Sequence, residues 1–135
     1  MKKQSVSSFF RHTLKAPFKN MQWSWGSSND ENVFLKVWEH ELKQNQSKAL
    51  VLRKSSPVSH GRREQLKHLM QVIGGKDGYC VVIAAKDTGL GSVRVVNYSE
   101  AVFKILGFET ELSTGDLYAV INPNESIHFT EPTEQ

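Results

Sequence analysis

Three tryptophans within sixteen residues are the side chains whose type and spacing most suggest binding chemistry. Trp23 and Trp25 alternate with small polar residues, and Trp38 lies in the apolar segment that follows. Because residues two apart share one face of a β-strand, Trp23 and Trp25 should form one aromatic surface, with Trp38 on the partner strand. Aromatic side chains on a sheet can stack nucleic-acid bases. The same pattern is more often part of a hydrophobic core than a ligand surface, so both interpretations stay open.

A group of basic side chains is the second candidate for binding. These residues are Arg53, Lys54, Arg62, Arg63 and Lys67. Arginine and lysine neutralise phosphates and position a nucleic acid without reading its sequence. Residues 1–75 hold 13 Lys/Arg and 5 Asp/Glu, whereas residues 76–135 hold 4 and 9. This asymmetry favours a polyanionic partner. The alternative is a solvated surface on which the charges mix in three dimensions.

The residue types and spacings of known catalytic and metal sites are not found in the sequence. The histidines lack the spacing of zinc ligands; they are His12, His40, His60, His68 and His128. Gly89-Leu90-Gly91 lacks the Gly-Lys-Ser/Thr ending of a phosphate-binding loop. Cys80 lies inside an apolar run, where a thiol ionises poorly. We therefore expect no catalytic residue, no metal, no cofactor and no enzymatic activity.

The strongest helix signal spans about residues 60–73, and it places several basic candidates. Apolar residues recur there at helical spacing as one stripe, at Leu66, Leu69, Met70 and Ile73. Arg63 and Lys67 fall on the opposite face. Ser59 is the predicted N-cap, and Gly74-Gly75 should end the helix. A shorter helix is predicted from Ser5 or Ser7 to Leu14.

Six or seven short strands and a further short helix complete the expected elements. The strands are predicted at residues 21–26, 33–38, 49–52, 79–85, 93–98, 108–112 and 117–121, and the helix near 99–104. Turn-forming residues separate the first two strands at 27–32. The continuous apolar run 79–85 should be a central strand covered on both faces. Because the connections are mostly local hairpins, we expect an α+β fold: a small curved antiparallel sheet or barrel with two to three helices.

The chain length of 135 residues fits one domain. We expect this domain to span residues 1–121, followed by a flexible acidic tail at 122–135. No apolar run approaches the roughly 20 residues of a membrane span. Arg11 interrupts the apolar segment that a secretion signal would need. A single cysteine suits a reducing compartment, so the predicted location is the cytoplasm, without membrane contact.

Two long segments carry a resemblance to a known family. The first contains Phe9-Phe10, Thr13-Leu14, Ala16-Pro17, Asn20, Trp23-Ser24-Trp25-Gly26 and Val33–Trp38, and the second contains Gly61–His68, Gly75 and the strand from Tyr79. Together, over roughly residues 8–120, they resemble the N-terminal domain of some bacterial HNH endonucleases. The resemblance implies a PUA-like fold, the class of EVE and SRA domains. Several of those domains read modified bases in DNA, in some cases by flipping a base into an aromatic-walled pocket.

The resemblance departs from those enzymes in one respect: no HNH motif is found, and the chain ends where the nuclease domain would begin. It therefore implies a reader of a restriction-modification type without its nuclease. We expect a nucleic-acid-binding module, with DNA favoured over RNA, and a nuclease or other defence protein as a further partner. The alternative is a protein-interaction module of a phage or mobile element that modulates a host defence or restriction system. The expected nucleic-acid-binding residues are Trp23, Trp25, Trp38, Arg53, Lys54, Arg62, Arg63 and Lys67.

Overall fold

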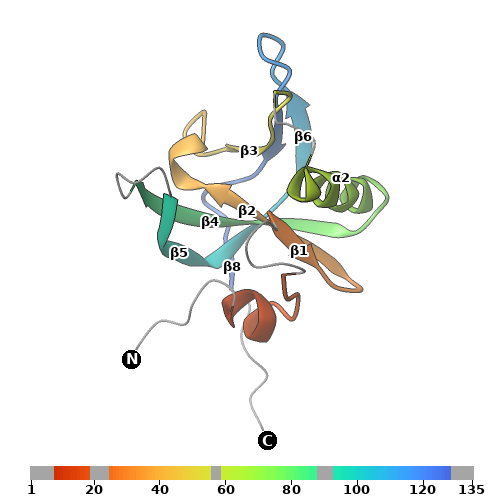
Figure 1. Ribbon diagram of the computed structural model, residues 1–135, viewed down its shortest axis with the longest axis vertical. Coiled ribbons are helices and arrows are strands. Elements are labelled where there is room, and N and C mark those ends of the chain that lie inside the picture. Colours follow the sequence, from red (N-terminus) through yellow and green to blue (C-terminus); the bar gives the residue numbers. More distant parts are fainter. Residues whose placement is uncertain (1–7, 19–24, 56–58, 88–92, 129–135) are drawn as a thin grey trace, which may run out of the picture.

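The structure is a computed structural model that describes residues 8–18, 25–55, 59–87 and 93–128 (Figure 1). Its elements are η1 (Phe9–Thr13), β1 (Gly26–Ser28), β2 (Asn32–Trp38), η2 (Glu39–Glu41), β3 (Lys48–Leu52), α2 (His60–Ile73), β4 (Asp77–Asp87), β5 (Val93–Lys104), β6 (Gly107–Thr110), β7 (Leu117–Val120) and β8 (Ile127–His128). In these ranges no helix has the length and apolar character that crossing a membrane requires.

The strands form two sheets. The larger has the order β1-β2-β4-β5-β8, and the smaller has the order β3-β7-β6. The expected α+β class is confirmed. The expectation of an antiparallel sheet or barrel is wrong, because β2 and β4 run parallel and the larger sheet is open, with β1 and β8 at its two edges.

The parallel pair explains why the sheet differs from a chain of hairpins. Phe34 pairs with Tyr79 and Leu35 pairs with Cys80, although these residues are 45 positions apart. Parallel neighbours need a long crossover connection, usually a helix. Here β3 and α2 form that connection between β2 and β4. β2 therefore pairs on one side with its hairpin neighbour β1 and on the other side with β4, which follows α2 in the sequence.

The central strand β4 is covered on both faces, as the sequence predicts. Tyr79 and Val81 pack with Phe34, and η1 adds Phe9 and Phe10 to this side. On the other side Cys80 packs in a second core with residues of β2, α2 and the smaller sheet. Complete burial raises the pKa of the Cys80 thiol to about 12, which disfavours the thiolate.

The N-terminal helix is confirmed as a single short turn, with its end at the predicted place. Phe9, Phe10 and Leu14 are all buried. The turn is of the π type, and Ala16 N donates to Phe10 O at 2.8 Å just before Pro17. The predicted caps at positions 5 and 7 lie outside the described residues.

The ends of α2 are also confirmed. Ser59 Oγ accepts a hydrogen bond from Arg62 N at 3.2 Å, and Gly75 has φ +122° after the last turn. The helix is rotated, however, so that only part of its apolar stripe contacts the core. Of that stripe, Leu69 is buried, while Met70 and Ile73 are more than 70% exposed.

Two boundaries in the larger sheet correct the sequence analysis. β1 reaches Ser28, so the predicted turn begins later, at Asn29, whose Oδ1 accepts from Asn32 N at 2.8 Å. The predicted helix at 99–104 is wrong, since β5 continues as one strand to Lys104. The buried residues Tyr98 and Val102 are four positions apart, a spacing that fits either a helix or a strand. Both residues pair with β4, so this segment is a strand.

The C-terminal part of the described chain adds two features. The hairpin of β6 and β7 matches the predicted strands, with Gly115 at φ +79° in its turn. Within the expected tail, β8 pairs with β5, so that Ile127 lies opposite Val102. The expected tail therefore contains a short strand at the sheet edge. Residues 129–135 lie outside the described residues.

Candidate nucleic-acid interface

Two tryptophans, Trp25 and Trp38, are described by the structure, and they lie beside and along β2. Trp25 is half-buried just before β1, and its carbonyl oxygen accepts from Lys36 N at 2.9 Å. Trp38 ends β2 and packs, partly buried, against the core that contains Phe34. Trp23 lies outside the described residues. Trp38 therefore contributes to the hydrophobic core with its buried part, which agrees with the core interpretation for this tryptophan.

Lys36 is a cation that the sequence analysis did not select, and it shares a strand face with Trp38. Its Nζ lies 4.8 Å from the centroid of the Phe18 ring. Burial lowers the pKa of Lys36, while the negative charge of Glu64 on α2 acts in the opposite direction. The only sequence signal for this contact is that Lys36 alternates with Phe34 and Trp38 along the strand, which puts all three side chains on one face.

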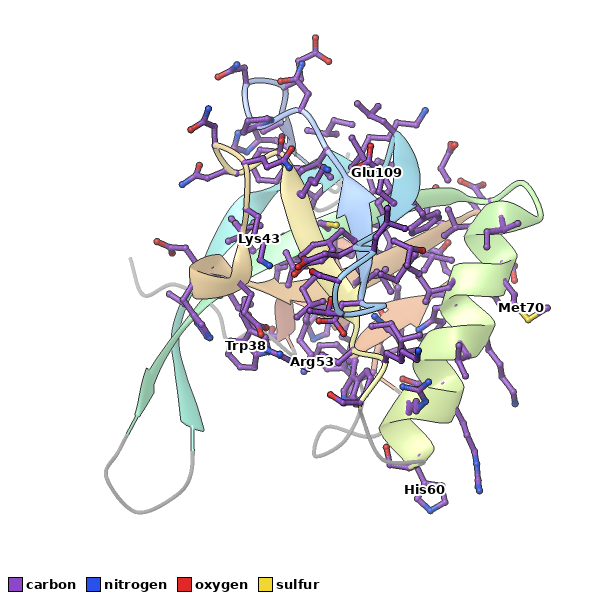
Figure 2. The ribbon with its side chains drawn as sticks, turned by 90° about the horizontal axis from the view of Figure 1, so that it is seen from above. Trp38, Lys43, Arg53, His60, Met70 and Glu109 are labelled. Carbon is purple, nitrogen blue, oxygen red and sulfur yellow. The ribbon has the colours of Figure 1, made fainter. Side chains whose placement is uncertain are left out.

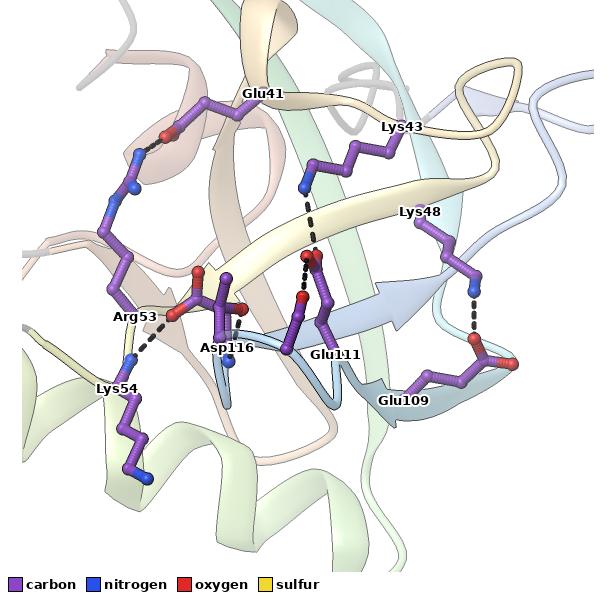
Figure 3. A network of polar contacts seen from close by, with 10 residues as sticks. Glu41, Lys43, Lys48, Arg53, Lys54, Glu109, Glu111 and Asp116 are labelled. Atoms are coloured by element: carbon purple, nitrogen blue, oxygen red, sulfur yellow. Dashed lines mark hydrogen bonds and ion pairs between the residues drawn. The ribbon is translucent and has the colours of Figure 1, made fainter.

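Three of the predicted cations lie where β3 leads to α2; we call Arg53, Lys54 and Arg62 the arginine corner. Arg62 Nη1 donates to Arg53 O at 2.8 Å, so the start of α2 contacts the chain that leaves β3. Lys54 N donates to Asp116 Oδ1 at 2.9 Å (Figure 3). The corner is thus assembled from two segments and held by the β6–β7 turn.

The corner is joined to the strand that carries Trp38. The Arg53 guanidinium forms an ion pair with Glu41 in η2, which directly follows Trp38 (Figures 2 and 3). The Arg53 side chain is 54% exposed. The Glu41 side chain is only 14% exposed, so the value of about 0–1 kcal/mol for fully exposed pairs is a lower bound here, and a phosphate must outcompete Glu41 for this guanidinium.

The other two predicted cations lie elsewhere. Arg63 and Lys67 are exposed on the outer face of α2. Within the described residues, no carboxylate lies within 4.0 Å of either cation. The structure therefore divides the five predicted cations into the arginine corner and a separate pair on the helix.

A second charged site, on the smaller sheet, was not predicted. A cavity of about 290 Å³ is lined by Lys43, Gln44, Lys48, Glu109, Thr110, Glu111 and Tyr118. Lys43 Nζ lies 3.0 Å from Glu111 Oε2 and 5.1 Å from the Tyr118 ring centroid, and Lys48 pairs with Glu109. Hydrogen bonds to Tyr118 and Glu111 raise the pKa of Lys43. Each lysine here has a carboxylate partner, as Arg53 has in Glu41, so ion pairing alone does not distinguish this cavity from the arginine corner.

Of two further cavities, one is mostly apolar and the other also contains Lys76 and Asp77, and neither is lined by a tryptophan. One of about 200 Å³ is lined by Glu39, Leu42, Gln46, Val82, Phe103, Ile121 and Pro123. The other adjoins the end of α2 and includes Ile73, Leu106 and Phe108. Across the described ranges, no three His, Cys, Asp or Glu side chains gather closely enough to hold a metal ion.

Comparison with known proteins adds no functional assignment to this geometry. The chain matches no family model, no curated protein and no solved structure. The resemblance to PUA-like domains stays a prediction made from the sequence.

Proposed function

We propose that this chain is a nucleic-acid-binding module that holds the phosphate backbone at the arginine corner. The supporting observation is that Arg53, Lys54 and Arg62, predicted from separate segments, lie together beside the strand end that carries Trp38. Guanidinium groups bind phosphate through charge-assisted hydrogen bonds. DNA is favoured over RNA by the resemblance to domains of DNA-cutting enzymes.

The proposed binding exchanges partners at Arg53. A phosphate replaces Glu41 on the exposed guanidinium, while Arg62 keeps its hydrogen bond to the Arg53 carbonyl and orients the corner. The exposed part of Trp38 then stacks a neighbouring base, an interaction of about 1–3 kcal/mol. Recognition of a modified base is the finer part of this proposal, and it is supported by the resemblance alone.

The test compares two double variants for binding to fluorescently labelled DNA at fixed salt. Arg53→Ala with Arg62→Ala should weaken binding at least tenfold, because the phosphate contact of Arg53 and the Arg62 hydrogen bond that orients the corner are both lost. Lys43→Ala with Lys48→Ala is the matched control, since it removes the same number of cations, both ion-paired and both outside the arginine corner. Equal losses in both variants would mean that only net charge matters and would contradict a corner-specific site.

A second function, protein binding, is favoured by a separate observation. The exposed side of α2 presents Met70 and Ile73 to solvent, and Figure 2 shows Met70 pointing away from the rest of the molecule. Large exposed apolar groups that lie together are typical of protein-interaction sites. The residues differ from those of the arginine corner, so the two functions can be tested independently.

A further inference from the structure

The outward rotation of α2 is fixed by contacts on its inner side. Gln65 Nε2 donates to Val51 O at 2.8 Å in the interior, and His68, one turn later, is also buried. This leaves Leu66, Met70 and Ile73 with 39%, 71% and 72% of their surface exposed. An amphipathic helix ordinarily turns its apolar stripe to the core. Here the buried side combines polar with small and apolar residues, and most of the apolar stripe faces solvent; the buried residues are Gly61, Glu64, Gln65, His68 and Leu69.

The exposed stripe has the dimensions of a helix-docking site. Leu66, Met70 and Ile73 follow the spacing i, i+4, i+7 and extend about 10 Å along the axis, two turns of the helix. Apolar anchors at this spacing are typical of helix-on-helix recognition. The surface continues at the end of α2 into a groove of about 350 Å³ that includes Leu106, itself 63% exposed.

Two cations border this stripe, which corrects their predicted place on the opposite face of the helix. Arg63 lies three residues before Leu66, and Lys67 lies three residues before Met70, so each cation neighbours an apolar side chain on the helix surface. Both are exposed, and neither has a carboxylate within 4.0 Å among the described residues. We call these five residues the α2 face: an apolar stripe with positive charge along it.

We propose that the α2 face binds an acidic amphipathic helix of a partner protein. Apolar side chains of that helix would cover Leu66, Met70 and Ile73, while glutamates or aspartates at its edge would pair with Arg63 and Lys67. A second copy of this chain fits less well, because a two-fold contact between two α2 faces brings four cations into one interface, and the five residues of this face include no carboxylate. A nucleic acid would satisfy the cations but leave the apolar stripe without a matching surface.

The experiment measures fluorescence anisotropy of three labelled, helix-forming peptides. The first has leucines at i, i+3, i+4 and i+7 with glutamates beside them; the second has lysines in place of the glutamates; the third has serines in place of the leucines. The acidic amphipathic peptide should bind at least tenfold more tightly than either of the others. Reversing the charges in Arg63→Glu with Lys67→Glu should invert the preference between the first two peptides.

The apolar contribution is tested by Met70→Ser with Ile73→Ser. This variant should lose at least tenfold in affinity for the acidic amphipathic peptide. Leu112→Ser is the matched control, because Leu112 is 98% exposed but lies in the β6–β7 turn. Arg53→Ala with Arg62→Ala should leave peptide binding unchanged, which separates this site from the proposed nucleic-acid site.

Several outcomes would overturn the proposal. Equal binding of the serine peptide would make the α2 face a surface for negative charge alone, as a nucleic acid would use it. Equal binding of the lysine peptide would show unspecific apolar adhesion. A dimer in sedimentation analysis that Met70→Ser with Ile73→Ser dissociates would assign the surface to a second copy. Absence of saturable binding for all three peptides would also reject it.

Discussion

At the scale of single residues, Trp38 is the side chain that both packs against the core and remains partly exposed for binding. It packs against the core beside η1 but remains partly exposed at the end of β2. We expect Trp38→Ala to lower the free energy of unfolding by about 1–3 kcal/mol, less than the roughly 3–5 kcal/mol typical of a fully buried tryptophan. If Trp38 also stacks a base, the variant should bind DNA at least fivefold more weakly, by about 1 kcal/mol or more.

The control for Trp38 is Phe108→Ala, an aromatic residue packed partly buried on β6. It should lower stability in urea unfolding while leaving DNA affinity unchanged. Loss of stability without loss of affinity in Trp38→Ala would assign that tryptophan to the core alone.

His68 provides a pH-dependent contribution to stability. Burial, followed by the positive charge of Lys76, lowers the pKa of His68 to about 4, against about 6.5 in the unfolded chain. Between these values the unfolded chain binds the additional proton, so the folded state loses stability as the pH falls from about 6.5 towards 4. The loss should reach roughly 2 kcal/mol by pH 4.5.

Urea unfolding at pH 7.5 and 4.5 measures this effect. His68→Gln removes the titrating group but keeps a polar side chain, so the difference between the two pH values should shrink by most of that amount. An unchanged difference in the variant would place the pH dependence on other groups.

Polar contacts between distant residues were the hardest feature to predict at this scale. Glu41 meets Arg53 twelve positions later, and Lys43 meets Glu111 sixty-eight positions later. Sequence spacing carries no signal for such pairs, because the strands between them decide which side chains meet. The chemical types of the corner residues were predictable, but the carboxylate that engages Arg53 was not.

At the scale of elements, the inner contacts of α2 set its rotation. Gln65→Ala removes the donor to the Val51 carbonyl and leaves that buried oxygen without this bond. We expect the free energy of unfolding to fall by about 1–3 kcal/mol. Met70→Ser, on the exposed side, should change it by less than about 0.5 kcal/mol. Urea unfolding of both variants checks the difference, and the reverse order of effects would contradict the observed rotation.

The short strand β8 makes a second prediction at this scale. Ending the chain after position 124 removes β8 and its pairing with β5. Because Ile127 and His128 are exposed and the strand has two residues, the melting temperature should fall by only a few degrees. Ending the chain after position 128 is the matched control and should have a smaller effect. Loss of cooperative unfolding in the first variant would show that the C-terminal strand supports the whole sheet.

The limits of α2 and the position of β4 could be predicted, whereas the rotation and the pairing could not. Caps and apolar runs are local signals, and Ser59 and the run from Tyr79 carry them clearly. Which side of α2 is buried depends on the sheet beneath it, where Val51 offers a carbonyl to Gln65. The parallel pairing of β2 with β4 likewise depends on the crossover as a whole.

At the scale of the whole molecule, the structure separates three charged regions that the sequence presents as one basic half. The arginine corner lies where β3 leads to α2, Arg63 and Lys67 lie along the outer side of α2, and the Lys43 and Lys48 ion pairs lie on the smaller sheet. The excess of positive charge in residues 1–75 is therefore spread over several surfaces. Only site-specific variants can distinguish the contribution of each region.

The most direct test of the central claim is the salt dependence of DNA binding. Each phosphate neutralised by Lys or Arg contributes about −0.9 to the slope of log K against log salt concentration. The triple variant Arg53→Ala, Lys54→Ala, Arg62→Ala should therefore have a slope flatter than that of the unmodified chain by about two units or more. An unchanged slope in this variant, with a flatter slope in Lys43→Ala with Lys48→Ala, would contradict binding at the arginine corner.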